Sequence, residues 1–405
     1  MKLTKHILTP FLAGIILMTS SAKAQDDERN YSQFLNTITT SVPFLIIGPD
    51  SRAGAMGDVG AATMPDANSG YWNTAKSAFL EQEQALTISY IPWLRSLVND
   101  IYMAQAGYTW KPNERLSLNH GIRYFSLGQI QFRGEDANLL QTVEPSELAV
   151  DLAGIGYKFN ERFSGGFAVR YIFSNLTAGN PVGGSDTKPG HAVAVDLNGF
   201  YKKPIKLGDK EADYLFGFNI QNIGNKISYS ESADRDFIPM NLKLGTGINI
   251  TLDEFNDFGL YMDVNKLLVP TPPSYSTEKD ANGDLIIEAG KDPNVSTAQG
   301  IIQSFYDAPG GFQEEFNEIN WSVGAEYWYD QQFALRMGYF YENPNKGNRN
   351  HITMGFGLKY NIFNLDFSYL VPLTQRNPLE NTLRFTMTFD FADIKKIAEG
   401  ESSED

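Results

Sequence analysis

The sequence predicts an all-β fold, a 14-stranded antiparallel transmembrane β-barrel with an N-terminal plug segment. Three observations support this prediction. Apolar and polar residues alternate along segments of about ten residues, the length that a tilted strand needs to cross a bilayer. The connections between these segments are alternately short and long. After residue 24 no uninterrupted apolar run reaches about 18 residues, which excludes a membrane protein built from helices.

The alternation is clearest near the C-terminal end of the chain. From 382 to 391 every even position is threonine, arginine or aspartate, whereas every odd position is leucine, phenylalanine or methionine. Such a segment forms a strand with one polar and one apolar face. Segments of this kind predict strands at 84–90, 101–110, 115–125, 147–159, 162–173, 192–201, 213–221, 239–250, 257–266, 319–329, 332–341, 351–361, 364–371 and 381–391. An even number of strands returns both ends of a barrel to the same side.

The connections between the predicted strands differ systematically in length. The short ones are 111–114, 160–161, 202–212, 251–256, 330–331 and 362–363. The long ones are 91–100, 126–146, 174–191, 222–238, 267–318, 342–350 and 372–380. Outer-membrane barrels have short periplasmic turns and longer extracellular loops, whereas a soluble β-sandwich has no reason to alternate them. We therefore expect both termini in the periplasm and the long loops outside the cell, in a bacterial outer membrane.

The N-terminus has the layout of a secretory signal. Residues 1–24 begin with two lysines, continue with an apolar run from Ile7 to Met18, and end in Ala22-Lys23-Ala24. The alternative, a membrane anchor, is disfavoured because the run is short and contains Pro10. Removing this signal peptide takes away three lysines and no acid, so the formal charge changes from −15 to −18. Such a charge argues against nucleic acid as a partner.

Twelve charged residues are predicted to face the lumen, and their signs balance. They are Arg123, Arg170, Lys243, Arg336, Lys359, Arg384, Asp151, Asp196, Asp263, Glu326, Asp366 and Asp390. Opposite charges in a confined space can pair, so we expect a plugged or narrow lumen rather than an open pore. The alternative is that lumen water solvates each charge separately.

The segment before the barrel contains glycines that break any strand or helix periodicity, and it is long enough to fold inside the barrel mouth. We therefore divide the chain into a signal peptide (1–24), a periplasmic segment and lumen plug (25–80), the barrel (81–391) and an acidic periplasmic tail (392–405). The Gly-x-x-Gly-x-x-Gly spacing differs from the dinucleotide fingerprint and favours close backbone packing. The candidate plug residues are Arg52, Gly54, Gly57, Asp58, Gly60 and Asn73.

The same segment carries a resemblance to a known family. Residues 49–62 (PDSRAGAMGDVGAA), 65–69 (PDANS) and 72–76 (WNTAK), followed by 90–94 (YIPWL), closely resemble the N-terminal signature of the PorV family. These are outer-membrane proteins of the type IX secretion system of Bacteroidetes, and they group with the FadL-like barrels. The wider FadL group often has Asn-Pro-Ala where this chain has Asn73-Thr74-Ala75, which weakens any transfer of fatty-acid transport.

The resemblance implies a 14-stranded barrel with a plugged lumen and a carrier role. PorV-like proteins bind secreted cargo by its C-terminal β-domain at the translocon barrel and deliver it to the surface attachment, or sortase, complex. The expected partners are therefore the translocon, cargo β-domains, the attachment complex and outer-membrane lipid. The alternative is a FadL-like transporter that moves hydrophobic small molecules across the outer membrane.

The sequence offers little that could carry catalysis. The chain has no cysteine, and His120, His191 and His351 lie in different predicted strands without metal-ligand spacing. Ser276 to Lys279 and Asp280 to Asp284 match a lactamase-like and a calcium-loop pattern only partly, and Asn282-Gly283 favours a hairpin turn instead. We therefore expect no enzyme activity, cofactor or metal; a lipopolysaccharide-modifying enzyme is the weakest hypothesis, since no nucleophile–base pair is present.

Apolar residues on the predicted external loops are the candidate contacts for cargo or partners. They are Trp93, Leu94, Ile301, Ile302, Phe305, Tyr306, Phe312 and Phe316. Those after residue 300 recur at spacings of three and four, which predicts short helices with one apolar face. They could dock a partner or fold back as a lid over the barrel mouth. Asn119 and Gly121 predict a kink in the third strand that would resemble a lateral opening.

Overall fold

The computed structural model describes most of the chain. The described residues are 35–133, 136, 138–177, 186–230, 235–280, 283–374 and 377–391. The expected signal peptide 1–24 and acidic tail 392–405 lie outside the described residues.

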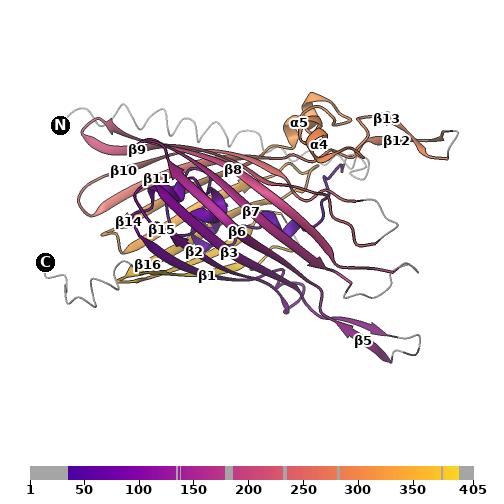
Figure 1. Ribbon diagram of the computed structural model, residues 1–405, viewed down its shortest axis with the longest axis horizontal. Coiled ribbons are helices and arrows are strands. Elements are labelled where there is room, and N and C mark those ends of the chain that lie inside the picture. Colours follow the sequence, from indigo (N-terminus) through magenta and orange to yellow (C-terminus); the bar gives the residue numbers. More distant parts are fainter. Residues whose placement is uncertain are drawn as a thin grey trace. The chain divides into compact units, whose positions relative to one another are not determined.

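Fourteen antiparallel strands form a closed barrel, which confirms the predicted fold (Figure 1). Each strand pairs with its neighbour in chain order, and the first pairs with the last to close the ring. The strands are β1 (Gln84–Pro92), β2 (Ile101–Trp110), β3 (Leu116–Leu127), β6 (Ser146–Lys158), β7 (Phe163–Asn175), β8 (Gly190–Leu207), β9 (Lys210–Gly224), β10 (Asn241–Thr251), β11 (Asn256–Leu267), β14 (Asn320–Tyr329), β15 (Phe333–Tyr341), β16 (Asn350–Tyr360), β17 (Phe363–Pro372) and β18 (Leu383–Asp390).

The largest difference from the predicted strand limits is at β8 and β9. The sequence predicted a connection over 202–212, but both strands continue through most of it and Gly208-Asp209 alone turns the chain. Pro204 and several lysines gave this stretch the composition of a loop. Cross-strand pairs extend it instead, including an ion pair of 3.1 Å between Lys202 Nζ and Asp213.

The long connections contain structure of their own. Two hairpins, β4 (Ile130–Arg133) with β5 (Leu139–Val143) and β12 (Ser274–Lys279) with β13 (Leu285–Ala289), project beyond the barrel at one end. The helices α4 (Thr297–Gln303) and α5 (Phe312–Asn317) lie at the same end (Figure 1). The predicted short helices are therefore present, and β12 and β13 form a hairpin where the sequence predicted one.

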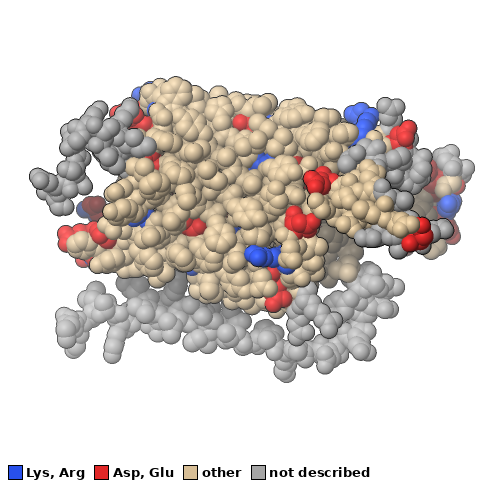
Figure 2. Space-filling view, turned by 90° about the horizontal axis from the view of Figure 1, so that it is seen from below, with Lys and Arg blue, Asp and Glu red and all other residues tan. Residues whose placement is uncertain are grey.

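The two faces of the barrel strands separate by polarity as predicted. On β18 Arg384 and Thr386 are buried, whereas Phe385 and Met387 are exposed. Over its middle the visible face in Figure 2 carries few charged side chains, and charged residues gather toward the ends. This is the pattern of a barrel whose outer surface contacts lipid tails. None of the described helices is long and apolar enough to cross a membrane.

Residues 42–80, called the plug segment below, lie inside the barrel (Figure 1). Its elements are η2 (Pro43–Ile46), α2 (Ser51–Ala55), α3 (Ser69–Trp72) and η3 (Lys76–Phe79). The strands carry glycine where this segment presses on the wall. A Cβ at Gly217 would collide with the Ala61 carbonyl oxygen, and one at Gly338 with the Met56 backbone. Close backbone approach therefore accounts for glycine within these strands.

An apolar cluster fills the lumen at the end that carries the long connections. Phe44 and Leu45 of the plug segment pack there with Met103, Phe125 and Ile172 of the wall. The Phe44 and Phe125 rings are stacked with their centroids 5.9 Å apart. The lumen, which the sequence predicted to be charged, therefore also contains an apolar cluster next to the long connections.

Candidate functional site

Buried ion pairs join the plug segment to the barrel wall. Arg52 of α2 donates from Nε and Nη2 to the Glu326 carboxylate at 2.9 and 2.7 Å. Glu326 also accepts from Arg336 Nε at 2.6 Å, and Arg336 Nη1 donates to Asp366 at 2.6 Å. All four side chains are buried, so the network is not screened by bulk water. Removing one member would leave the others as uncompensated buried charges.

A second contact holds the turn after α2. Asp58 accepts hydrogen bonds from both terminal nitrogens of Arg384 on β18. The preceding Gly57 has φ +72°, a conformation that favours glycine, and a Cβ there would meet the Tyr339 backbone. Glycine at this position therefore lets the chain turn against β15 and present Asp58 to the arginine.

The remaining candidate plug residues also pack between the segment and the wall. Asn73 Nδ2 donates to the Ala61 and Gly199 carbonyl oxygens, both at 3.0 Å, which ties two parts of the plug segment to β8. A side chain at Gly54 would collide with Arg384, and one at Gly60 with the Trp72 ring. The structure thus brings all six candidate plug residues into one packed unit.

Two titratable plug residues that sequence reasoning did not single out are fully buried. Burial raises the pKa of Asp50 to about 6, and the nearby Asp66 adds to the rise. Burial lowers the pKa of Lys76 to about 8, although its Nζ donates to Gly60 O and Thr63 Oγ1 at 2.8 and 2.7 Å. Neither group faces a partner on which it could act chemically, so both are parts of the packing.

The wall beside the plug segment contains an irregularity. β6 has one extra residue near Leu152, because Asp151 pairs with Gly121 while Gly154 pairs with Asn119. The kink expected in the third strand is therefore a β-bulge on the neighbouring strand, and β3 pairs with β2 without interruption. The sequence did not predict this bulge, because Leu152 and Ala153, the residues at the shift in strand register, are both apolar.

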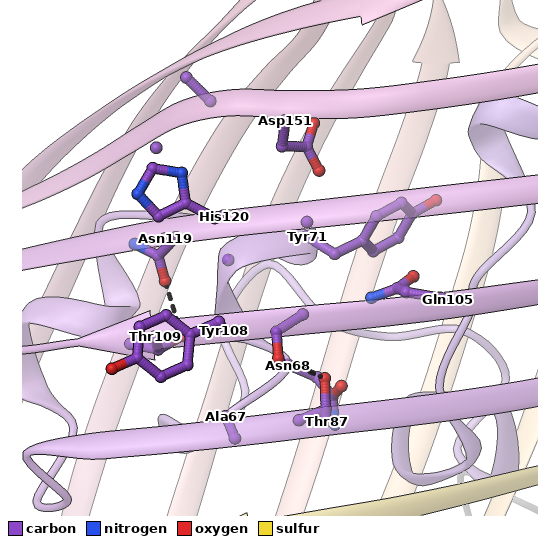
Figure 3. A pocket seen from close by; sticks show the side chains of 15 residues that line it. Ala67, Asn68, Tyr71, Thr87, Gln105, Tyr108, Thr109, Asn119, His120 and Asp151 are labelled. Atoms are coloured by element: carbon purple, nitrogen blue, oxygen red, sulfur yellow. Dashed lines mark hydrogen bonds between the residues drawn. The ribbon is translucent and has the colours of Figure 1, made fainter.

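A small cavity of ≈ 20 Å³ lies at this bulge. Its lining includes inward-facing Asn119 and Gln105 as well as outward-facing His120 and Tyr108, so it reaches into the barrel wall (Figure 3). Asn119 also accepts a hydrogen bond from Thr109 Oγ1 at 3.0 Å. This volume holds about one water molecule.

At the other end of the candidate site, residues 268–319, called the platform loop below, are tied to the barrel rim by charges. Lys266 Nζ, at the end of β11, donates to Glu315 and Glu318 at 3.0 and 2.6 Å. Lys346 Nζ, in the connection before β16, donates to Glu318 at 2.9 Å and to Glu314 at 2.5 Å. Lys266, Lys346, Glu315 and Glu318 are buried. The acidic side of α5 is thus fixed to two barrel connections.

The opposite side of the platform loop is apolar and exposed. We call it the aromatic face, formed by Ile302, Phe305, Tyr306, Phe312 and Phe316. The exposed fraction of Phe312 is 85 %, and at least half of each of the other four is exposed. Exposed aromatic clusters on an ordered element are typical of interaction sites. The two alternatives left open by the sequence, docking of a partner and a lid over the mouth, both stay predictions.

The structure separates the remaining candidate contacts from the aromatic face. Trp93 and Ile301 are only partly exposed and pack against the apolar cluster of the lumen. Leu94 adopts a left-handed backbone conformation in the connection after β1. The helical period explains the difference, because consecutive residues such as Ile301 and Ile302 point about 100° apart around α4. The acidic side of α5 was not predicted, although Glu315 and Glu318 are three residues apart, a helical spacing.

Comparison with known proteins gives one family and a set of remote structural likenesses. Curated proteins yield no match. The chain is similar to the toluene transporter TbuX of Ralstonia pickettii at 12 % identity, over 85 % of this chain and 98 % of that one, with a TM-score of 0.45. It is also similar to a Pseudomonas aeruginosa FadL homologue at 11 % identity, over 88 % and 99 %, with a TM-score of 0.44. With such low identities and TM-scores, no functional statement about this chain rests on either likeness.

The family model described as type IX secretion system protein PorV matches residues 29–274. That range covers more than half of the sequence, including the plug segment and the barrel as far as the start of the platform loop. It therefore confirms the resemblance carried by the N-terminal signature. The chain belongs to the PorV family of type IX secretion system proteins.

Proposed function

We propose that this chain binds secreted proteins by their C-terminal β-domains at the secretion translocon and delivers them to the surface attachment complex. Membership of a type IX secretion family supports a secretion role in the outer membrane. The observation that carries the finer proposal is the aromatic face on an anchored loop. In this arrangement the long connections are extracellular, both termini are periplasmic, and the plug segment closes the lumen.

Two properties of the platform loop favour protein binding. Large aromatic side chains such as Phe305 and Phe312 supply most of the binding energy at protein interfaces when a partner buries them. The ion pairs of Lys266 and Lys346 already hold the loop in place, so less conformational entropy is lost on binding. An anchored apolar face suits repeated capture of successive cargo proteins.

The test replaces both Phe305 and Phe312 by aspartate. The side chains are exposed, so the barrel should assemble as in the wild type, while attachment of cargo at the cell surface should fall by about tenfold or more, the loss of one hot-spot residue. The matched control is Phe132→Asp, which changes an exposed phenylalanine on the β4–β5 hairpin. Cargo attachment is measured by surface labelling of whole cells.

Barrel assembly is followed by the difference in gel migration between unheated and boiled samples, because closed barrels resist detergent. If the double variant assembles and attaches cargo at the wild-type rate, the aromatic face is not the docking surface. If the Phe132 variant loses attachment equally, the effect is not specific to the platform loop.

A second candidate function is lateral passage of a hydrophobic small molecule through the wall, which the bulge on β6 favours. Gly107, Gly121 and Gly154 line the cavity there and leave the wall thin. Deleting Leu152 should restore regular pairing and slow the uptake of a hydrophobic dye into vesicles that contain the barrel. Unchanged uptake would contradict lateral passage through the wall, but it would leave the docking proposal intact.

A further inference from the structure

A second, larger cavity of ≈ 130 Å³ lies between the plug segment and barrel strands from β9 to β18. It is near the end of the barrel that carries the long connections, because Trp93, Arg349 and Leu379 of three such connections contribute to its lining. Its size is close to that of a cavity of about 150 Å³ that holds one benzene molecule. There is room inside the cavity for one residue-sized group.

The wall of this cavity is rich in cationic N–H donors. Three cations, Lys243, Arg349 and Arg384, line it together with the single carboxylate of Asp58. The Asp58 carboxylate accepts a hydrogen bond from Arg384 and is therefore already paired. Arg349 donates from Nε and Nη2 to Glu342, which stands behind the wall, both at 2.8 Å. Lys243 lies 3.8 Å from Asp263, so each of the three cations has a carboxylate partner. A ligand with acceptor oxygens would use the N–H donors that Lys243 and Arg349 keep beyond these pairs.

Lys243 has hydrogen-bonding capacity to spare. Its Nζ donates to the Asp58 carbonyl oxygen at 3.1 Å, stands 3.8 Å from Asp263, and lies 4.3 Å from the centre of a Trp72 ring. An ammonium group has three N–H donors. Of these three contacts only the one to the Asp58 carbonyl oxygen is within hydrogen-bond distance, so a donor can turn toward a ligand in the cavity.

His351 supplies an independent observation at the same wall. Its side chain is 4 % exposed, lines the cavity, and has no hydrogen-bond partner on either ring nitrogen among the described residues. The ring is stacked on Phe340 with centroids 5.0 Å apart and an interplanar angle of 7°. Buried polar groups almost always have a partner, so an unpartnered imidazole in a cavity indicates a missing ligand group.

The rest of the lining indicates what kind of ligand fits. Gln221, Asn241, Asn265 and Asn320 provide side-chain amides, which pair with the N–H and C=O groups of a peptide backbone. Trp72, Trp93, Phe340 and Leu370 provide apolar surface for one side chain. A fatty acid offers a carboxylate but no amide to pair with these side chains.

We propose that this cavity binds the C-terminal residue of a polypeptide through its free α-carboxylate. Lys243 and Arg349 face the carboxylate, His351 hydrogen-bonds to it or to the last amide, and the aromatic residues surround the terminal side chain. The inference rests on the proposed function only in that a secreted protein would supply the peptide. The test uses purified protein and no cargo, so the two proposals can fail separately.

The experiment measures fluorescence anisotropy with the full chain in detergent micelles. The probe is a fluorescein-labelled hexapeptide, Gly-Ser-Gly-Ser-Leu-Phe, with either a free carboxylate or an amide at its C-terminus. The free acid should bind about tenfold or more tightly than the amide, the size of effect expected for one charge-assisted hydrogen bond. Unlabelled decanoate tests the fatty-acid alternative and should not displace the peptide.

Two variants test the wall. Lys243→Met keeps the length of the side chain and Arg349→Gln keeps part of its polarity; each should reduce the preference for acid over amide to less than about threefold. The matched control is Lys359→Met, which changes an inward-facing lysine of β16 outside the cavity and should keep the full preference. Equal binding of acid and amide, displacement by decanoate, no binding of either peptide, or variants that behave like the control would overturn the proposal.

Discussion

The plug segment and the platform loop are both irregular stretches held by buried ion pairs, but they use those pairs differently. The plug segment buries its charges and its apolar side chains alike, as with Arg52 against Glu326 and Phe44 against Phe125. The platform loop buries its charged side, through Glu315 and Glu318, together with Leu268 and Val269, but leaves the aromatic face in contact with water. The plug segment is packed within the chain, whereas the platform loop has an apolar surface that a partner would cover.

The largest expected effect comes from removing the first of these regions. Deletion of residues 42–80 should leave a barrel, because the strands pair with one another in a closed ring. It should greatly raise the permeability of vesicles to small solutes, which swelling assays measure. Unchanged permeability would contradict the assignment of the segment as a plug.

A smaller effect is expected from breaking a single anchor of the plug segment. Arg52→Ala leaves Glu326 buried beside Arg336 without its second partner, which should destabilise the packed segment by about 3–5 kcal/mol. Hydrogen exchange of backbone amides in the segment should accelerate accordingly. The double variant Arg52→Met with Glu326→Leu removes both charges and should recover much of the protection; if it does not, the pair is not what holds the segment.

The comparable change at the platform loop should act on function rather than on permeability. Glu318→Leu removes the carboxylate that Lys266, Lys346 and Thr271 share. The loop should loosen, and cargo attachment should fall severalfold, less than in the double variant of the aromatic face. The contrast is tested by solute permeability of the same variant, which should stay at the wild-type value; a leaky barrel would show that the two regions are not independent.

The smallest effect concerns pH. Burial raises the pKa of Asp307 to about 6, and Glu315 and Glu318 contribute to the rise. The folded loop therefore holds this proton more tightly than an opened loop, so the stabilisation is present below about pH 4 and is lost as pH rises through about 6. Hydrogen exchange in the loop, corrected for intrinsic rates, should increase across that range.

The variant Asp307→Asn keeps the shape of the side chain without its charge and should abolish this pH dependence. Asp292→Asn, which changes an exposed carboxylate of the same loop, is the control and should behave as the wild type. If exchange in the Asp307 variant still rises with pH, another group controls the opening of the platform loop.

The sequence predicted the barrel well because strand alternation and turn residues are local signals. The contacts of the plug segment could not be predicted from the sequence. Arg52 and Glu326 are far apart in the chain, and any of several lumen acids could have paired with that arginine. The bulge on β6 was not predicted for a different reason. Two neighbouring apolar residues lie at the one-residue shift in strand register, so the alternation does not show it. Ile301 was grouped with Ile302 by hydropathy alone, although one faces the lumen and the other faces water.

The most direct test of the central claim is site-specific photocrosslinking in native membranes. A benzophenone amino acid at position 312 should crosslink to secreted proteins through their C-terminal β-domains, whereas the same group at position 132 should give little or no such product. Crosslinks from position 132 that equal those from position 312, or none to any secreted protein from position 312, would contradict the account.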